Sequence, residues 1–215
     1  MTKPARGRFI TFEGGEGAGK STQIARLATC LQKRGLSVVQ TREPGGTPTA
    51  ESIRDVLLAD LPSGETWDPL AETLLHFAAR RQHVTDLIEP ALAAGSWVLC
   101  DRFFDSTTAY QGYGMGVDTG LVGDLRRLTL GDFRPDLTLL LDIPVEQGLS
   151  RAGRRADVDT RYEKMALSFH EKLRNGFLAI ARSEPDRFHV VDALLSADAV
   201  EKEIADTVVT RFDLS

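Results

Sequence analysis

Short apolar runs alternate with longer amphipathic stretches along this chain. The residues of each run are mostly apolar or β-branched, which is typical of strands covered on both faces of a sheet. The runs are Phe9–Phe12, Ser37–Thr41, Trp97–Cys100, Leu137–Leu141 and Phe188–Val191. We therefore predict five buried parallel strands.

The stretches between the runs carry apolar residues at helical spacing. Ile24, Leu27 and Leu31, for example, share one helix face, and Gly35 follows where a helix-ending glycine is favoured. The predicted helices are Lys20–Arg34, Ala50–Leu58, Asp68–Ala94, Leu121–Leu130, Tyr162–Ser183 and Ala197–Phe212. Strands that alternate with helices indicate an α/β fold, a five-stranded parallel sheet with helices on both faces.

Ligands of such sheets bind beyond the carboxyl ends of the strands. Gly14, Pro44, Asp101 and Asp142 each follow one of these ends. We therefore expect the functional residues to gather there, although they are far apart in sequence. Asp142 either lies near a bound metal ion or caps the following turn.

The composition is that of one globular domain spanning residues 1–215, with 42% hydrophobic and 27% charged residues. A net charge of −5 argues against nucleic acid as a partner, because sequence-independent binding needs many cations. The two cysteines, Cys30 and Cys100, exclude a disulfide scaffold, and we expect both in the core. No secretory signal and no membrane-length apolar stretch is visible, so we expect a soluble, cytoplasmic protein with no membrane partner.

The most specific local signal is a phosphate-binding loop. Residues 14–21 match GxxxxGK[ST], follow a strand and open a helix, as this pattern requires. The backbone N–H groups and the helix N-terminus surround phosphate oxygens, while Lys20 supplies an exposed, mobile charge and Ser21 a hydroxyl for Mg²⁺. The predicted ATP-binding residues are Gly14, Gly15, Glu16, Gly17, Ala18, Gly19, Lys20, Ser21 and Thr22.

A motif that is missing narrows the reaction class. GTPases usually carry Asn-Lys-x-Asp, but the one asparagine of this chain, Asn175, precedes Gly176. A small-molecule kinase therefore becomes the leading class. A P-loop ATPase or a nucleotide-binding regulator without an acceptor remains the alternative from another class.

An acid and a cation follow the predicted third strand. Asp101 is placed to hold an Mg²⁺ water or to orient Lys20, and Arg102 can clamp an anionic second substrate. Further arginines, Arg42, Arg54, Arg80 and Arg81, lie in segments that can reach the same cleft. This local concentration suggests a phosphate on the acceptor as well as on ATP.

Four segments together resemble bacterial thymidylate kinases. They are 41–47 (TREPGGT), 101–103 (DRF), 105–112 (DSTTAYQG) and 131–138 (GDFRPDLT). The resemblance runs from Phe9 to about Ala193, and this combination in this order is far more specific than the P-loop alone. It implies a P-loop NTPase fold and phosphoryl transfer from ATP to dTMP. The nearest alternative is a kinase of another nucleoside monophosphate, such as dUMP or dCMP.

The resemblance also assigns roles at matching positions. Arg102, helped by Arg54, would hold the 5′-phosphate of dTMP, and Arg80 would hydrogen-bond the thymine carbonyl. Thr107 and Gln111 would contact the base edge. These are the roles expected from their chemistry, because arginines meet phosphate and neutral polar groups meet the base.

The sugar has its own predicted contacts. By resemblance, Tyr110 would sit against the sugar and disfavour a 2′-hydroxyl, and Glu16 would approach the 3′-hydroxyl directly or through water. The complete set of predicted acceptor-binding residues is Glu43, Pro44, Arg54, His76, Arg80, Arg102, Ser106, Thr107, Tyr110 and Gln111.

One position departs from the family pattern. The family usually stacks a phenylalanine on thymine four residues before the equivalent of Arg80, where this chain has His76. Phe77 is adjacent but points about 100° away on a helix. We expect His76 to stack on the base; in the alternative, His76 faces solvent and Phe77 lies in the core.

Residues 150–161 form the predicted lid, with arginines at 151, 154, 155 and 161. The variable P-loop positions, 15–18, carry no basic residue, and phosphoryl transfer needs cations on the moving group. This agrees with the subgroup of thymidylate kinases that has catalytic arginines in the lid. Arg151 and Arg155 are the first candidates, and Arg154 follows closely.

The sequence thus predicts a Mg²⁺-dependent thymidylate kinase. The predicted metal-binding residues are Ser21 and Asp101. The predicted catalytic residues are Glu16, Lys20, Arg102, Arg151 and Arg155. A homodimer is expected from the resemblance alone.

Overall fold

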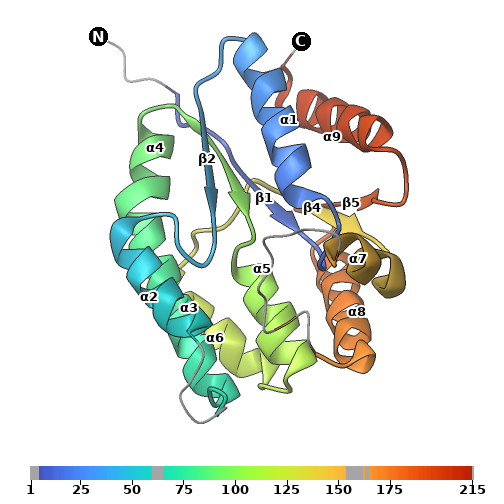
Figure 1. Ribbon diagram of the computed structural model, residues 1–215. Coiled ribbons are helices and arrows are strands. Elements are labelled where there is room, and N and C mark those ends of the chain that lie inside the picture. The colour runs from blue at the N-terminus through green and yellow to red at the C-terminus, as the bar shows by residue number, and fades with distance from the viewer. Residues whose placement is uncertain (1–4, 60–64, 154–161, 163–164, 215) are drawn as a thin grey trace.

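Figure 1 shows the computed structural model, which describes residues 5–59, 65–153, 162 and 165–214. Its centre is a five-stranded parallel sheet in the order β2-β3-β1-β4-β5. The strands are β1 (Phe9–Glu13), β2 (Val38–Arg42), β3 (Trp97–Asp101), β4 (Leu137–Asp142) and β5 (Phe188–Asp192). The prediction of an α/β fold with five parallel strands is confirmed, and each strand ends within one residue of its expected position. The expectation that all five strands are buried holds for β1, β3 and β4 but is wrong for β2 and β5, which are partly exposed because they form the two edges of the sheet.

Helices connect these strands. They are α1 (Lys20–Lys33), α2 (Pro48–Leu58), α3 (Pro69–His83), η1 (Val84–Ile88), α4 (Glu89–Ala93), α5 (Phe104–Thr107), η2 (Thr108–Gly114), α6 (Thr119–Leu130), α7 (Val145–Ala152), α8 (Leu167–Ser183) and α9 (Ala197–Phe212). The two segments η1 and η2 are π-helical and continue the α-helices before them. Among the helices described here, none has the length and apolar character needed to cross a membrane.

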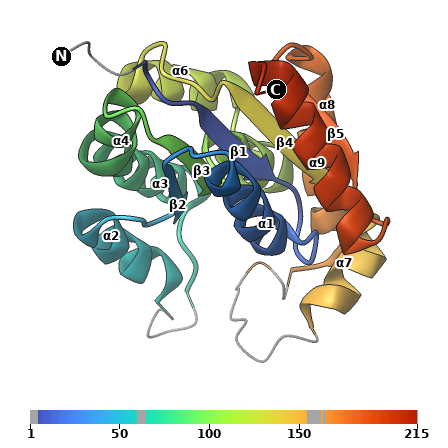
Figure 2. The same ribbon diagram turned by 90° about the horizontal axis from the view of Figure 1, so that it is seen from above.

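The alternation of side chains along β1 divides the core into layers. Ile10 and Phe12 pack with residues of α1 and α9, whereas Phe9 packs with residues of α3, α4 and α6. Figure 2 shows α1 and α9 on one face of the sheet and α3, α4 and α6 on the other. Helix α8 and segment η2 share a further cluster with Leu140 of β4. The last residues of β1, β3 and β4 therefore meet at one edge of a rigid, covered sheet.

Some predicted elements differ from the structure. The expected helix Tyr162–Ser183 begins only at Leu167, because Ala166 before it is extended, with ψ of 151°. The helices α5, η2 and α7 were not predicted. Cys100 is buried, but Cys30 is only partly buried and accepts a contact from Arg34 to its Sγ at 2.9 Å, so the expectation that Cys30 lies in the core is wrong.

Candidate active site

The loop between β1 and α1 requires glycine at two positions. Gly14 and Gly17 have φ angles of +135° and +68°. A Cβ on Gly14 would lie 2.4 Å from the carbonyl oxygen of Leu141, and one on Gly17 would lie 2.0 Å from that of Gly148. The loop is therefore pressed against β4 and α7. This packing fixes the path of the loop backbone, and the loop in turn directs the N-terminus of α1 at the site.

Lys20 is buried within this loop, with 8% of its surface exposed, so the expectation of an exposed charge is wrong. Its Nζ donates to the carbonyl oxygens of Gly14 and Gly15, both at 3.0 Å. These carbonyls satisfy the ammonium group and explain how it can be buried. Burial, together with the positive charge of Arg102, lowers the pKa of Lys20 to about 8.

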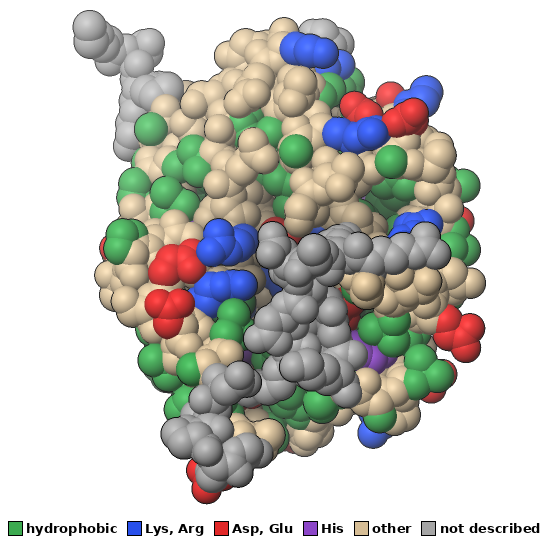
Figure 3. Space-filling model, in the orientation of Figure 1, with side chains coloured by type: hydrophobic (Ala, Val, Ile, Leu, Met, Phe, Trp, Pro, Cys, Tyr) green, Lys and Arg blue, Asp and Glu red, His purple; other side chains and the backbone are tan. Residues whose placement is uncertain are grey.

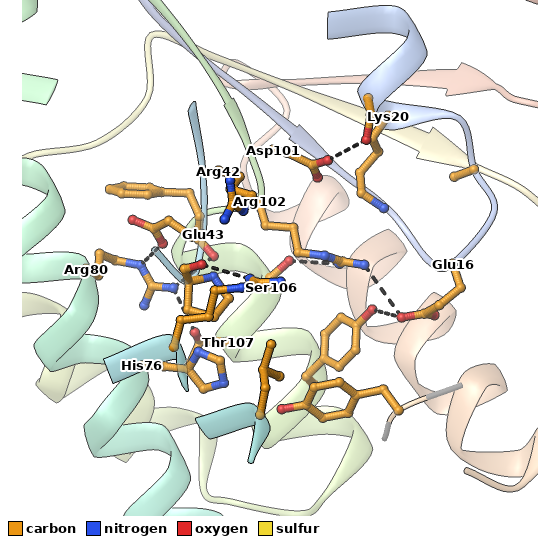
Figure 4. Close-up of a pocket in the computed structure, with 18 of the residues that line it drawn as sticks. Glu16, Lys20, Arg42, Glu43, His76, Arg80, Asp101, Arg102, Ser106 and Thr107 are labelled. Carbon is orange, nitrogen blue, oxygen red and sulfur yellow. Dashed lines mark hydrogen bonds and ion pairs between the residues drawn. The ribbon is translucent and has the colours of Figure 1, made fainter. Parts of the chain in front are cut away.

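The side-chain oxygens of Ser21 and Asp101 lie together where α1 faces the end of β3. The Ser21 hydroxyl donates to Asp101 Oδ2 at 3.1 Å. Asp101 Oδ1 is buried and has no hydrogen-bond partner among the residues described. Figure 4 shows Asp101 next to Lys20 at one end of the pocket. The arrangement leaves one carboxylate oxygen for a further ligand.

Arg102 follows β3 in a left-handed backbone conformation, with φ of +70°. Its Nη1 donates to the Gly14 carbonyl oxygen at 3.1 Å and to Ser106 Oγ at 3.2 Å. Its guanidinium lies 4.9 Å from the centre of the Tyr110 ring. In Figure 4 the side chain reaches across the pocket toward Glu16, where Nη2 lies 3.5 Å from Oε1.

Glu16 is surrounded by three groups that stabilise its ionised form. The Tyr110 hydroxyl donates to Glu16 Oε1, and His170 Nδ1 lies 3.5 Å from Oε2. Burial alone would raise the pKa of Glu16, but His170, the charge of Arg102 and the Tyr110 hydroxyl lower it to about 2. Burial raises the pKa of Tyr110. Tyr110 therefore remains a donor, and Glu16 remains a carboxylate that can accept further hydrogen bonds.

Arg80 forms the opposite end of the pocket. Its Nε donates to Glu43 Oε2 at 2.6 Å, and its Nη2 donates to Thr107 Oγ1 at 3.0 Å. Glu43 also contacts His83 Nδ1 at 3.1 Å. Arg80 Nη1 is buried and has no hydrogen-bond partner within the described part of the chain. A donor at the pocket wall is thus held in place for an acceptor that the described residues do not supply.

Neutral polar groups lie beside Arg80. Gln111 Nε2 donates to Glu72 Oε1 at 2.8 Å, and the Tyr162 hydroxyl donates to the same oxygen at 2.6 Å. His76 also lines the pocket, whereas Phe77 is buried in the core. His76 is therefore on the side that stacking requires, and Phe77 is not.

The remaining arginines differ in position. Arg54 Nη1 donates to the Pro44 carbonyl oxygen at 2.9 Å, and Arg42 pairs with Glu51 at 2.9 Å; both arginines line the pocket. Arg81 instead points to the Thr129 carbonyl, away from it. In Figure 3, basic and acidic side chains are interspersed over the described surface of this face rather than gathered into one basic field. The cations relevant to a ligand are inside the pocket.

These groups enclose a cavity of about 390 Å³, a size typical of small-molecule sites. The predicted residues that line it are Glu16, Gly17, Ala18, Gly19, Lys20, Ser21, Glu43, Pro44, Arg54, His76, Arg80, Asp101, Arg102, Ser106, Thr107, Tyr110 and Gln111. Gly14 and Gly15, at the start of the loop, do not line this cavity but face α7 and α8. Thr22 is exposed and does not line the cavity.

Of the lid candidates, the described one, Arg151, does not line this cavity. Arg151 belongs to the last turn of α7, and its Nη1 donates to the Ala193 carbonyl oxygen at 2.8 Å. Arg154, Arg155 and Arg161 lie outside the described residues. Asp142 makes a two-pronged ion pair with Arg174, at 2.7 and 2.8 Å, and it does not cap the following helix, α7, whose N-cap is Pro144.

The sequence did not identify four buried acidic or imidazole groups around the pocket. Glu13, Glu72, His83 and His170 hold pocket residues in place from behind. A signal was available for Glu13, because a carboxylate at the end of an otherwise apolar strand must find buried partners. Glu72 and His170 lie on helices whose polar positions looked like ordinary solvent-facing ones.

Comparison with known proteins adds an independent line of evidence. A family model described as thymidylate kinase matches residues 12–204. A thymidylate kinase of a Bradyrhizobium species is 52% identical, covering 97% of this chain and 92% of its own length. That of Caulobacter vibrioides is also 52% identical, covering 97% and 99% respectively. The crystal structure of thymidylate kinase from Ehrlichia chaffeensis aligns with a TM-score of 0.75 and 36% identity, over 94% of this chain and 99% of that one.

Proposed function

Because this chain belongs to the thymidylate kinase family, and so transfers the γ-phosphoryl group of ATP to dTMP on the route to dTTP, we propose that the pocket between the P-loop and β3 is where both substrates meet. One observation carries this proposal. Lys20 and Arg102 donate to the same carbonyl oxygen, that of Gly14, at 3.0 and 3.1 Å. The cation that serves the donor phosphates and the cation that serves the acceptor phosphate thus converge on one point.

Arg102 and Arg54 hold the 5′-phosphate of dTMP in this proposal. The thymine ring lies between His76 and the end of Arg80, whose unpartnered Nη1 donates to a ring carbonyl. Thr107 and Gln111 contact the base edge. The support for this placement is that Arg80 already has partners for Nε and Nη2, so that only Nη1 is left for the ligand.

The sugar lies against both Tyr110 and Glu16, which are hydrogen-bonded to each other. Tyr110 is 95% buried and donates its hydroxyl to Glu16, so its ring edge leaves neither room nor a partner for a 2′-hydroxyl. The ionised Glu16 accepts a hydrogen bond from the 3′-hydroxyl, directly or through water. Both contacts select a 2′-deoxy, 3′-hydroxy acceptor.

Mg²⁺ fits the pair Ser21 and Asp101, because a hydroxyl and a carboxylate 3.1 Å apart offer hard oxygen ligands and Asp101 Oδ1 is left without a partner in the described chain. When bound, Mg²⁺ would neutralise charge on the ATP phosphates. Within the described segments, no cluster of three or more His, Cys, Asp or Glu could form a metal cage. We therefore propose that phosphate oxygens and water complete the coordination.

The chemistry requires positioning and charge stabilisation rather than a base. The dTMP phosphate is already an anionic nucleophile, so the side chains need only align it with the γ-phosphate and neutralise the charge on the transferred group. Lys20 does so from the P-loop. Arg151 and Arg155 are proposed to supply the cations that the P-loop lacks.

We propose a homodimer that uses the outer face of α2, α3 and α6. These helices pack side by side and expose apolar side chains, Val56 at 47%, Leu74 at 49% and Leu128 at 82% of their surface. Leu128→Glu should turn the dimer into a monomer in size-exclusion chromatography with light scattering. A reducing compartment, and hence the cytoplasm, is supported by two unpaired cysteines.

A coupled ADP-release assay over a panel of monophosphates tests the site assignment. We expect turnover with dTMP to exceed that with dUMP, dCMP and ribothymidine monophosphate, and ATP hydrolysis without acceptor to stay at background. Arg80→Met should raise the KM for dTMP more than the KM for ATP. If Arg80→Met leaves both constants unchanged, the base does not lie at Arg80.

A further inference from the structure

Glu13 is a fully buried carboxylate that the proposed contacts do not use. It is the last residue of β1, directly before the P-loop, and 0% of its surface is exposed. The alternation along β1 places Glu13 on the same side of the sheet as Phe9 and Thr11. A buried carboxylate is costly unless it is hydrogen-bonded, so its partners show what it holds.

Both carboxylate oxygens of Glu13 accept hydrogen bonds from the segment after β3. The Phe103 N–H donates to Oε1 at 2.8 Å, and the Ser106 hydroxyl donates to Oε2 at 2.6 Å. Ser106 Oγ in turn accepts from Arg102 Nη1 at 3.2 Å. Glu13 thus hydrogen-bonds the backbone N–H immediately after Arg102. Through Ser106 it is also connected to the Arg102 guanidinium.

Arg102 needs such support. A non-glycine residue with φ of +70° is held in a sparsely populated conformation that persists only where its surroundings impose it. The Arg102 N–H donates to the Phe12 carbonyl oxygen at 2.9 Å, and Glu13 fixes the next peptide. Neighbouring residues of β1 therefore hold Arg102 from both sides.

The ionised form of Glu13 makes the better relay. Arg102 and Lys20 are the cationic groups that interact with it, Asp105 is an anionic one, and the Cys100 thiol lies nearby. Burial, and then Asp105, raise the pKa of Glu13 to about 8. A proton on Oε2 would weaken or reverse the hydrogen bond with Ser106, because a protonated carboxyl oxygen is a poorer acceptor than a carboxylate oxygen.

We propose that Glu13 is a positioning residue, which acts through Ser106 and the Phe103 peptide to fix Arg102 in the orientation that receives the acceptor phosphate. This inference rests on the proposed role of Arg102. Glu13 does not touch either substrate. Its removal should therefore be felt on the acceptor side of the reaction and not on the ATP side.

Three variants test the relay in the full-length protein. Glu13→Gln keeps the size but supplies an NH₂ where an acceptor is needed, and Ser106→Ala removes the link while leaving Glu13 intact. Each should raise the KM for dTMP by about tenfold or more, with the KM for ATP changed by less than about twofold. Ser106→Thr keeps the hydroxyl and should raise the KM for dTMP less than Ser106→Ala does.

Arg102→Ala separates this inference from the assignment beneath it. If Arg102→Ala leaves the KM for dTMP unchanged, the proposed role of Arg102 is wrong. If Arg102→Ala raises this KM and Glu13→Gln and Ser106→Ala do not, only the relay is wrong. If all three raise it, Glu13→Gln should add nothing in the Arg102→Ala background, because both changes then remove the same contact. If the two changes have additive effects on the KM for dTMP in the double variant, the relay is wrong. It is also wrong if Ser106→Thr loses as much activity as Ser106→Ala. Should Glu13→Gln fail to fold, the serine variants decide.

Discussion

Replacing Glu43 by methionine removes the carboxylate that holds Arg80 while keeping a side chain of similar length. Glu43 and Arg80 are 3% and 2% exposed, and their 2.6 Å contact is an ion pair within the protein. After the change, Arg80 would keep Thr107 at 3.0 Å and the Phe103 carbonyl at 3.3 Å, both neutral. Breaking a buried pair from one side costs about 3–5 kcal/mol, because a buried charge loses its partner.

The reverse substitution should cost less. In Arg80→Met, Glu43 still has His83 Nδ1 as a hydrogen-bond partner at 3.1 Å, so the carboxylate is not left alone. We expect about 1–3 kcal/mol for this variant, the usual penalty for one lost partner. The double variant should be more stable than Glu43→Met alone, because an apolar pair leaves no charge behind.

Urea denaturation of the nucleotide-free protein at pH 7 measures these differences in the free energy of unfolding, and thermal denaturation gives the corresponding midpoints. For a chain of this size each kcal/mol corresponds to roughly 2–4 °C in the thermal midpoint, so Glu43→Met should lower that midpoint by roughly 6–20 °C. Asp206→Asn is the control, since it breaks an exposed pair with Lys202 and should leave the midpoint in place. If Glu43→Met behaves like Asp206→Asn, or if Arg80→Met is the more damaging change, the asymmetry argued here is wrong.

Further outcomes are expected at the P-loop, the sugar and the lid. Lys20→Met should abolish phosphoryl transfer yet raise the unfolding midpoint at pH 7. The reason is that burial lowers the pKa of Lys20 from 10.5 to about 8, so the folded state binds this proton less well than the unfolded chain does. The stability that Lys20 contributes should accordingly rise between pH 8 and 10.5, which pH-dependent denaturation of the two proteins will show. Steady-state kinetics should show that Tyr110→Ala narrows the preference for dTMP over ribothymidine monophosphate. Arg151→Ala should cut kcat at least about tenfold with little change in the KM for dTMP; an unchanged kcat would remove Arg151 from catalysis.

Strands were predictable because their signal is local. Each of the five is a short run of apolar or β-branched residues that ends at a glycine, proline or charged side chain. Helices α5, η2 and α7 were missed for a physical reason. The segment 104–114 lies against Arg80, Glu16 and the acceptor cavity, so its polar residues face inward and conceal the amphipathic pattern. Helix α7 has only eight residues, too few for a periodicity to stand out.

The candidate site divides in the same way. Residues that belong to contiguous motifs, such as Lys20, Asp101 and Arg102, could be identified from spacing and from strand ends. Glu72 and His170 could not, because their roles depend on which side chains meet across helices distant in sequence. Gln111 Nε2 meets Glu72 Oε1 at 2.8 Å across 39 residues of chain. Contacts of this kind, between residues distant in sequence, depend on how the helices pack, and no local sequence pattern predicts them.

The charge of the pocket supports the proposal that a net acidic protein binds two anionic substrates there. The described side chains that line it include five cationic residues, Lys20, Arg42, Arg54, Arg80 and Arg102, and three acidic ones, Glu16, Glu43 and Asp101. The whole chain carries −5. Two of the acids are used to orient arginines, Glu43 on Arg80 and Glu16 on Arg102. A positive excess confined to a partly enclosed cavity attracts phosphate more strongly than the same charges spread over a surface, because the surrounding protein screens them less than water does. The proposed preference for a small anion over a nucleic acid rests on this enclosed position of the cations.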